Sequence, residues 1–225
     1  MKRAGARAGA ARSGLVLLHG RGGSAADMLQ LAAGLALPDV AMIAPEAPGQ
    51  SWWPTSFLAP MPQIAPFLEA GLAAIDAAVE TLQAEGLARD AIGLCGFSQG
   101  ACLALEYAAR KGSGLSAVFG FSAGLVGTGD APGPLRDDLY GHAGKRFDYT
   151  SRLDGLVVDM SCHERDPHIP LARFLESASV LSRLGAQVAH RTYPGAGHAV
   201  MHPDISALRA HLNRGPVGEA EGRAL

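Results

Sequence analysis

Short, almost wholly apolar runs alternate with longer helical stretches along most of this 225-residue chain. The apolar runs lie at residues 14–20, 40–45, 91–97, 116–122, 155–162 and 186–193. They show little alternation of polar and apolar residues, which is typical of strands buried on both faces of a sheet. Strands that alternate with helices in this way predict an α/β protein, with a mostly parallel central sheet and helices on both of its faces.

The helical stretches between these runs are predicted at residues 67–86, 99–112 and 171–185, with weaker patterns at 27–36 and 203–212. In the first, apolar residues recur at three- and four-residue spacing from Leu68 to Leu82, as on one buried helix face. Gly86 stands where a helix C-cap is expected.

Two stretches are predicted to be irregular. Residues 45–66 hold six prolines, and residues 124–150 are rich in glycine and aspartate. Loops of this length are uncommon inside a domain and often line a site.

One domain is expected over residues 14–213, because no internal repeat or linker divides the chain. Residues 1–13 and 214–225 are predicted to be poorly ordered tails. The N-terminal segment "MKRAGARAGAAR" is basic but lacks the apolar region that a secretory signal needs.

Composition narrows the class of protein. With 48% apolar and 18% charged residues, the chain is neither disordered nor fibrous. A formal net charge of −2 without a basic stripe gives no reason to expect a nucleic-acid partner. No run approaches the ~18 consecutive apolar residues of a membrane span. Three cysteines without Cys-x-x-Cys spacing argue against a disulfide framework and suit a cytoplasmic protein.

Ser98 lies in "GLCGFSQGAC", where Gly96 and Gly100 form the pattern Gly-x-Ser-x-Gly between an apolar strand and an alanine-rich helix. In a nucleophile elbow the serine occupies a strained strand-to-helix turn, and the glycines let backbones pass closely. The helix N-terminus adds N–H groups near a developing oxyanion. A serine N-cap at a glycine-rich turn is the alternative, but the strand and helix context favours a nucleophile.

A serine hydroxyl needs a base to act as a nucleophile, and His198 is the histidine best placed for this. It lies in "YPGAGHAV", just after the last predicted strand. Loops that follow parallel strands emerge at one edge of the sheet, where ligands bind, and Ser98 lies on that edge. His202 is the alternative base, but it precedes Pro203, where a helix is expected to begin.

The base in turn needs an acid to hold it. Asp166, in "CHERDPHIP", follows another strand on the same edge, and the proline after it favours an extended conformation. Asp159 and Glu164 are alternative acids. The order Ser98, Asp166, His198 is the chain order of the α/β-hydrolase triad.

An oxyanion hole needs two N–H donors. One is expected from Gln99, directly after the nucleophile, and the other from Arg21, in the glycine-rich "HGRGG" loop after the first long strand.

Four further residues are candidates for substrate binding: Trp52, Trp53, Phe97 and His168. The tryptophans could wall an acyl or leaving-group pocket, although core packing is the alternative for at least one of them. Phe97 could face the site or the sheet, and a structural hydrogen bond is the alternative for His168.

The chain resembles the phospholipase/carboxylesterase family of α/β-hydrolases, which includes the acyl-protein thioesterases. The matching pieces, spread over residues 17–200, are "LLHGRGGSAADMLQLA", "PEAPGQSWWPTSF", "GFSQGACLAL", "RDPHIP" and "YPGAGHAV". The resemblance implies an α/β-hydrolase fold without a separate lid domain, hydrolysis of small carboxylic esters without a cofactor, and a homodimer. It puts Ser98, Asp166 and His198 in the family's triad positions, and Arg21 and Gln99 in its oxyanion positions.

Two segments depart from the thioesterase members. "HERD" lacks the glycine that those members carry shortly before the catalytic aspartate, and "SWWPTSF" differs from their equivalent loop. The chain therefore resembles the bacterial esterase branch more closely, and protein depalmitoylation is not implied.

Other functions account for these residues less well. Dienelactone hydrolases use a cysteine where this chain has Ser98. The side chains that could assemble a metal site are His163, Asp166, His168, His198 and His202. No spacing such as His-Glu-x-x-His occurs among them, so no metal is expected. A non-catalytic small-molecule-binding protein of the same fold is the remaining alternative, because a fold alone never proves activity.

Overall fold

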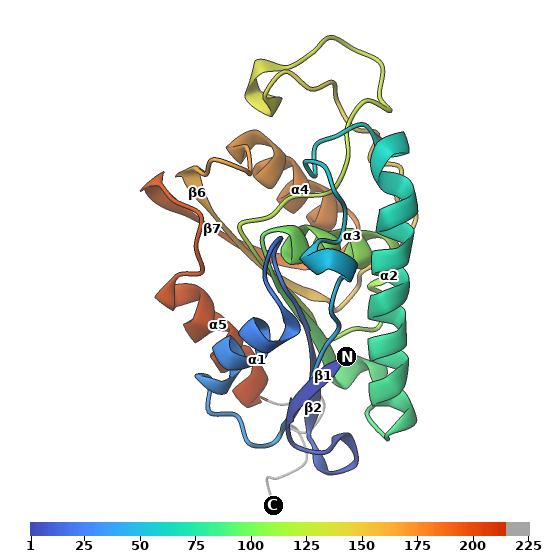
Figure 1. Cartoon of the computed structure of the whole chain (residues 1–225), viewed down its shortest axis with the longest axis vertical. Coiled ribbons are helices and arrows are strands. Elements are labelled where there is room, and N and C mark those ends of the chain that lie inside the picture. Colours follow the sequence, from blue (N-terminus) through green and yellow to red (C-terminus); the bar gives the residue numbers. More distant parts are fainter. Residues whose placement is uncertain (215–225) are drawn as a thin grey trace, which may run out of the picture.

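Seven strands form one central sheet in the computed structural model, which describes residues 1–214 (Figure 1). The strands are β1 (Lys2–Gly5), β2 (Ser13–Leu18), β3 (Val40–Ala44), β4 (Ile92–Phe97), β5 (Ala117–Phe121), β6 (Val157–Arg165) and β7 (Gln187–Ala196). Their order across the sheet is β1-β3-β2-β4-β5-β6-β7. Only β1 is antiparallel to its neighbour, so the carboxyl ends of the other six strands share one edge.

Within residues 1–214, five α-helices cover the two faces of the sheet (Figure 1). They are α1 (Ala25–Ala33), α2 (Met61–Ala84), α3 (Gln99–Lys111), α4 (Leu171–Arg183) and α5 (His202–Arg214). Apolar residues of α1 and α5 pack with one face of the strands, and those of α2, α3 and α4 pack with the other. Along β2, Leu15 and Leu17 pack on the face covered by α1 and α5, while Val16 and Leu18 pack on the face covered by α2, α3 and α4. This arrangement confirms the predicted α/β-hydrolase fold with helices on both faces.

The N-terminal segment corrects one prediction. Residues 1–13 are not a poorly ordered tail, because β1 pairs with β3 from Lys2 opposite Ala44 onwards, and Arg3 forms an ion pair with Glu85 at 2.7 Å. All four residues of β1 are exposed. An exposed edge strand is held by backbone hydrogen bonds, so no apolar pattern marks it in the sequence. At the other end α5 runs to Arg214, and the remainder of the predicted C-terminal tail lies outside the described residues.

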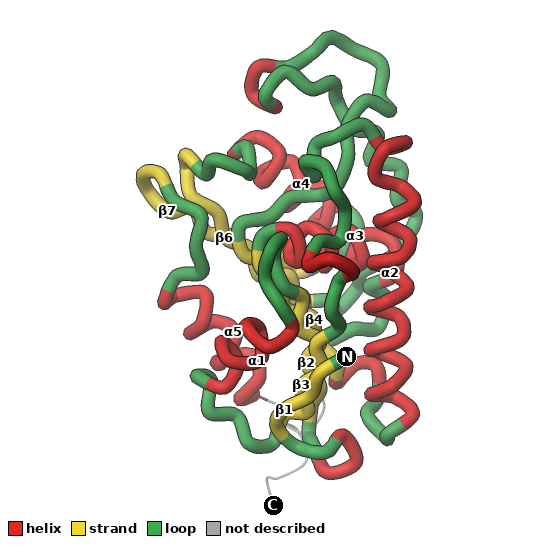
Figure 2. Tube along the Cα trace, viewed as in Figure 1, coloured by secondary structure: helices red, strands yellow, loops and turns green. Residues whose placement is uncertain are grey.

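The start of α2 corrects another prediction. Residues 45–66 were expected to be irregular throughout, but the helix begins at Met61 and includes Pro62 and Pro66. Pro62 fits the first turn because the N–H groups there have no partner within the helix, whereas Pro66 lies inside the helix and removes one of its backbone hydrogen bonds. The proline-rich loop therefore ends at residue 60. Figure 2 shows that this loop and the longer one after β5 gather at the same end of the molecule.

A buried polar cluster holds the loop after β5 against α3. The carboxylate of Glu106, which is fully buried, accepts hydrogen bonds from Tyr149 at 2.9 Å and from the backbone N–H of Val126 at 3.0 Å. The ammonium of Lys145, also buried, lies 3.5 Å from the same carboxylate and donates to the Val126 carbonyl. Burial lowers the pKa of Lys145, and attraction to Glu106 opposes this shift. One buried carboxylate thus organises a loop of otherwise irregular backbone.

No helix among residues 1–214 combines the length and apolar character that crossing a bilayer requires.

Replacement Glu106→Gln tests how much the cluster stabilises the fold. It leaves the buried ammonium of Lys145 without a compensating charge, so we expect a loss of about 3–5 kcal/mol in the free energy of unfolding. Urea denaturation followed by circular dichroism measures this loss. Glu85→Gln is the matched control, because its partner Arg3 is exposed and the expected loss is below about 1 kcal/mol. Equal losses in the two variants would contradict the stabilising role of the buried Glu106 cluster.

Candidate active site

Ser98 occupies the one-residue turn between β4 and α3. Its φ of 54° and ψ of −120° lie in a region that residues with a side chain seldom adopt. The Ser98 N–H donates to the Phe121 carbonyl on β5 at 2.9 Å, and its own carbonyl accepts from Cys102 in the first turn of α3. These bonds hold the strained turn and raise the hydroxyl above the carboxyl edge of the sheet.

The two glycines of the motif are required by close backbone contacts. A Cβ atom on Gly96 would lie 2.5 Å from the carbonyl oxygen of Gly100. A Cβ on Gly100 would overlap the carbonyl groups of Leu18 and His19 at the end of β2. The pattern Gly-x-Ser-x-Gly therefore reflects steric constraints on both sides of the turn.

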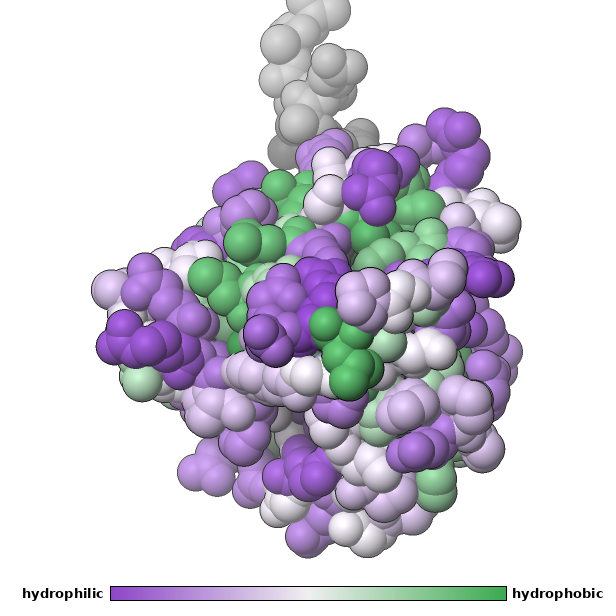
Figure 3. Space-filling view, turned by 90° about the horizontal axis from the view of Figure 1, so that it is seen from above, coloured by the Kyte–Doolittle hydropathy of each residue, from purple (hydrophilic) through white to green (hydrophobic). Residues whose placement is uncertain are grey.

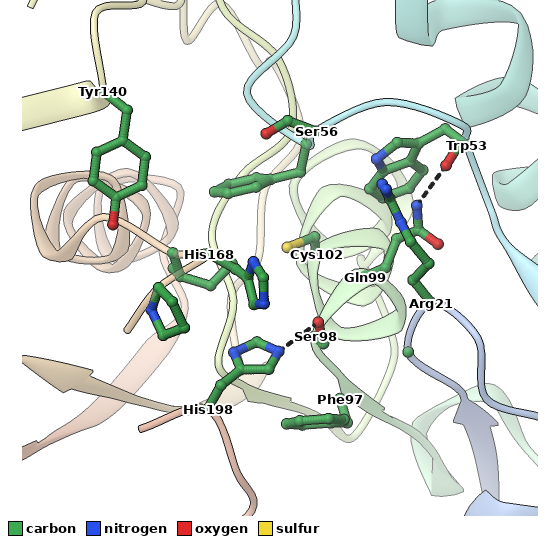
Figure 4. A pocket seen from close by; sticks show the side chains of 14 residues that line it. Arg21, Trp53, Ser56, Phe97, Ser98, Gln99, Cys102, Tyr140, His168 and His198 are labelled. Atoms are coloured by element: carbon green, nitrogen blue, oxygen red, sulfur yellow. Dashed lines mark hydrogen bonds between the residues drawn. The ribbon is translucent and has the colours of Figure 1, made fainter. Parts of the chain in front are cut away.

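His198 lies beside the serine, in the loop that follows β7 (Figure 4). Its Nε2 is 2.8 Å from Ser98 Oγ, and its Nδ1 is 2.8 Å from Asp166 Oδ2, just beyond β6. An ionised carboxylate can only accept hydrogen bonds, so Nδ1 carries the proton and Nε2 is left to accept from the serine hydroxyl. The structure thus brings together the three residues that sequence order suggested.

Asp166 is buried, but its carboxylate accepts several hydrogen bonds from protein donors. Its Oδ1 accepts from the backbone N–H groups of His168 at 2.8 Å and Ile169 at 3.1 Å. Burial favours a higher pKa for Asp166, but the hydrogen bonds from His198 and from these amides outweigh it and hold the pKa below the ordinary value. Because the folded-state pKa is the lower one, the ionised carboxylate stabilises the fold above the ordinary pKa of about 4, and this stabilisation is lost as pH falls through the folded-state value.

The residues weighed as alternatives have other partners. Asp159 forms an ion pair with Arg191, and Glu164 accepts a hydrogen bond from the Gly195 N–H at 3.1 Å. His202 is the first residue of α5. None of these three side chains lies within hydrogen-bond distance of Ser98 or His198.

Arg21 and Gln99, whose backbone amides are the expected oxyanion donors, line the same cavity as Ser98. Within residues 1–214, neither amide donates a hydrogen bond, so both are available to an oxygen atom in the cavity. The loop of Arg21 is fixed by His19, whose Nδ1 lies 2.8 Å from the Gly20 carbonyl and whose Nε2 accepts from the Ala47 N–H at 3.0 Å. This geometry suits a preorganised oxyanion hole.

The side chain of Gln99 joins the turn to the loop after β3. Its Nε2 donates to the Trp53 carbonyl at 2.8 Å, and its Oε1 accepts from the Trp52 N–H at 2.8 Å. The loop that carries the two tryptophans is therefore anchored directly beside the serine.

A cavity of about 470 Å³ opens above Ser98. Trp53, Phe97 and His168 line it, as the sequence suggested, and the rings of Phe97 and His168 lie 5.0 and 4.8 Å from that of His198. Trp52 does not line the cavity, which corrects its assignment to substrate binding. Its indole is buried and donates to the His19 carbonyl at 2.9 Å, so it supports the Arg21 loop instead.

Sequence reasoning missed several cavity residues. Tyr140, from the loop after β5, lines the cavity and donates to the Asp166 carbonyl at 3.0 Å, and Ser56 and Phe57 contribute from the loop before α2. Only the length of the two irregular loops pointed to these walls. Figure 3 shows small apolar patches between polar residues over the end of the molecule where these loops gather.

No group of three or more histidine, cysteine, aspartate or glutamate side chains within residues 1–214 is arranged to hold a metal ion.

Fold and family together define this chain as an α/β-hydrolase. The model of the Phospholipase/Carboxylesterase family matches residues 5–134, more than half of the chain, and the chain belongs to that family. This membership supports an esterase or thioesterase activity.

Individual relatives agree with this family. Acyl-protein thioesterase 1 of Gibberella zeae is 30% identical over 129 residues, which are 57% of this chain and 50% of that protein. The chain therefore matches about half the length of this curated relative. The crystal structure of a phospholipase/carboxylesterase from Dyadobacter fermentans is 33% identical, with a TM-score of 0.82 over 94% of this chain and 95% of that one. Esterase PE8 is 26% identical, with a TM-score of 0.71 over 95% and 97% of the two chains.

Replacement Gly100→Ala tests the steric constraint on the turn. The added Cβ must push α3 away from the end of β2, and a displacement of about 1 Å at a reacting group costs roughly 100-fold in rate. We expect a loss of about that size in the hydrolysis of p-nitrophenyl esters. Gly144→Ala is the control, since its Cβ meets only an ordinary contact at 3.7 Å and its expected effect is small. A Gly100→Ala variant with full activity would contradict the constraint.

Proposed function

We propose that this protein is a serine hydrolase that cleaves carboxylic esters of the carboxylesterase, lysophospholipase or thioesterase type. The observation that carries the proposal is the continuous line of hydrogen bonds from Ser98 Oγ through His198 to Asp166. Ser98 is the nucleophile, His198 the general base and Asp166 the group that orients His198 and stabilises its protonated form.

The first half of the reaction forms an acyl-enzyme. His198 Nε2 accepts the proton of Ser98 Oγ while Oγ bonds to the ester carbonyl carbon, and the carbonyl oxygen becomes an oxyanion. The amides of Arg21 and Gln99 donate to this oxyanion, where preorganised donors are most effective because the charge develops in the transition state. The imidazolium then gives its proton to the leaving alcohol, and the carbon–oxygen bond of the ester breaks.

The second half releases the acid. A water molecule gives a proton to His198 and attacks the acyl carbon, the same two amides stabilise the second oxyanion, and Ser98 recovers its proton as the carboxylic acid leaves. Phe97 and His168, which lie against the His198 ring, restrict its orientation during both proton transfers.

Other expectations from the sequence stay predictions. We also expect a single domain, a homodimer and a cytoplasmic location. Size-exclusion chromatography with light scattering tests the dimer. The three cysteines are free and buried, which suits a reducing compartment.

Labelling with a fluorophosphonate probe tests the nucleophile. The probe should attach to Ser98, and Ser98→Ala should abolish labelling and lower kcat by about 10⁶-fold. An unlabelled wild-type protein would favour the alternative, a non-catalytic small-molecule-binding protein of this fold.

Paired variants test the acid. Asp166→Asn should lower kcat by about 10⁴-fold, because it favours the wrong histidine tautomer. Glu164→Gln should remain close to wild type, because the Glu164 carboxylate accepts from the Gly195 amide and not from His198. If Glu164→Gln abolished activity while Asp166→Asn stayed close to wild type, Glu164 would be the acid that orients His198.

The pH profile tests the base. A histidine base must be neutral, and histidines exchange their proton between about pH 5 and 8. We expect kcat/KM to fall on acidification across this range with a slope of one proton. A flat profile from pH 5 to 8, with the fold retained, would rule out a histidine base.

A further inference from the structure

One wall of the cavity carries a cation without an acidic partner. Arg21 is the only lysine, arginine, aspartate or glutamate among the residues that line the described cavity. Its guanidinium donates to the Thr55 carbonyl, and within residues 1–214 no carboxylate lies within 4.0 Å of it. A guanidinium has five N–H donors in a planar fork, so most of them remain available to a ligand.

The same wall carries a second unused donor. The side chain of Trp53 is 1% exposed and lines the cavity, and its indole N–H has no acceptor among the described residues. Buried hydrogen-bond donors in native proteins are nearly always paired, so an unpaired N–H on a residue that lines a ligand cavity indicates an acceptor on the ligand. Figure 4 shows the Arg21 side chain running alongside the Trp53 indole. An unpaired indole N–H and a guanidinium with N–H groups to spare thus converge on one region.

The position of His198 indicates which part of an ester meets this wall. The leaving alcohol takes its proton from His198, so it departs on the His198 side of Ser98. In Figure 4, Arg21 and Trp53 lie on the opposite side of Ser98 from His198. The acyl part of the substrate leaves the reacting carbon on the side away from His198, which Arg21 and Trp53 share with the oxyanion-binding amides.

Part of the cavity lining is apolar. Phe57 and Cys102 contribute to it, and burial raises the pKa of the Cys102 thiol to about 12, so it stays neutral. An acyl group that fits here has an aliphatic segment next to the carbonyl and an acceptor beyond it. A carboxylate matches the planar fork of a guanidinium and can also accept from an indole N–H.

We propose that the substrates are half-esters of dicarboxylic acids, whose free carboxylate at the end of the acyl chain binds the Arg21 guanidinium and the Trp53 indole N–H. This inference rests on the proposed esterase function and names the substrate class of the same site. It gives Arg21 two roles, with its amide directed at the oxyanion and its side chain at the remote carboxylate.

The test compares mono-p-nitrophenyl adipate with p-nitrophenyl hexanoate, which has the same acyl length without the charge. Wild type should prefer the adipate in kcat/KM. Arg21→Met keeps the backbone amide and the aliphatic stem, and should lower the ratio of kcat/KM for the adipate to kcat/KM for the hexanoate by about tenfold or more, through the KM of the adipate. Arg21→Lys should recover part of the loss, and added salt should weaken only the adipate reaction.

Two further variants sharpen the result. Trp53→Phe removes the indole N–H while keeping an aromatic wall, and should also impair the adipate more than the hexanoate. Arg209→Met is the matched control for net charge, because Arg209 is likewise exposed and donates to a backbone carbonyl, that of Gly34, outside the cavity. It should leave both reactions unchanged.

The outcomes separate this inference from the proposed function. If fluorophosphonate labels Ser98 and the hexanoate is hydrolysed, but Arg21→Met affects both esters equally, the Arg21 side chain only holds the Thr55 loop and the inference is overturned. A third ester, p-carboxyphenyl hexanoate, carries the charge on the alcohol, and a loss confined to this ester would overturn the acyl placement. If the probe does not label and neither p-nitrophenyl ester is cleaved, the esterase proposal itself fails.

Discussion

The contact between Gly100 and the end of β2 is the constraint on which the candidate site depends. A side chain at this position would overlap the carbonyl groups of Leu18 and His19. Because none is present, the first turn of α3 lies against the loop that continues from β2. The Gln99 and Arg21 amides consequently line one cavity with Ser98. The strained backbone of Ser98 is part of the same arrangement, since the chain must reverse within one residue to bring α3 so close.

The walls of the cavity depend on a second kind of interaction, namely buried polar side chains that bind loop backbone. The side-chain amide of Gln99 holds the loop that carries Trp53, and the Glu106 carboxylate holds part of the loop after β5. Irregular backbone cannot satisfy its own N–H and C=O groups as a helix or sheet does, so such side chains supply the missing partners. Gln99 thereby holds Trp53 on one side of the cavity, and Tyr140, whose hydroxyl donates to the Asp166 carbonyl, lies on the opposite side, as Figure 4 shows.

The regular elements could be predicted well because their cores are periodic. Each of the six apolar runs became a strand, and the longest helix was recognised from its apolar face between Leu68 and Leu82. The failures share a physical cause. Every residue of strand β1 is exposed, and the first turns of α2 contain prolines, so in both places the structure depends on backbone interactions that side-chain patterns do not record. Trp52 was misplaced because its indole bonds a carbonyl in a distant loop.

The sequence by itself determined which residues meet at the carboxyl edge of the sheet. Ser98, Asp166 and His198 each follow a parallel strand, and the carboxyl ends of parallel strands must emerge together whatever the loops do. Only the tertiary structure decided what surrounds them: which tryptophan faces the cavity, that Tyr140 reaches the Asp166 carbonyl, and that Arg21 and Trp53 present unused donors on one wall. These features depend on loops without periodicity, whose conformations are fixed by hydrogen bonds between residues far apart in the chain.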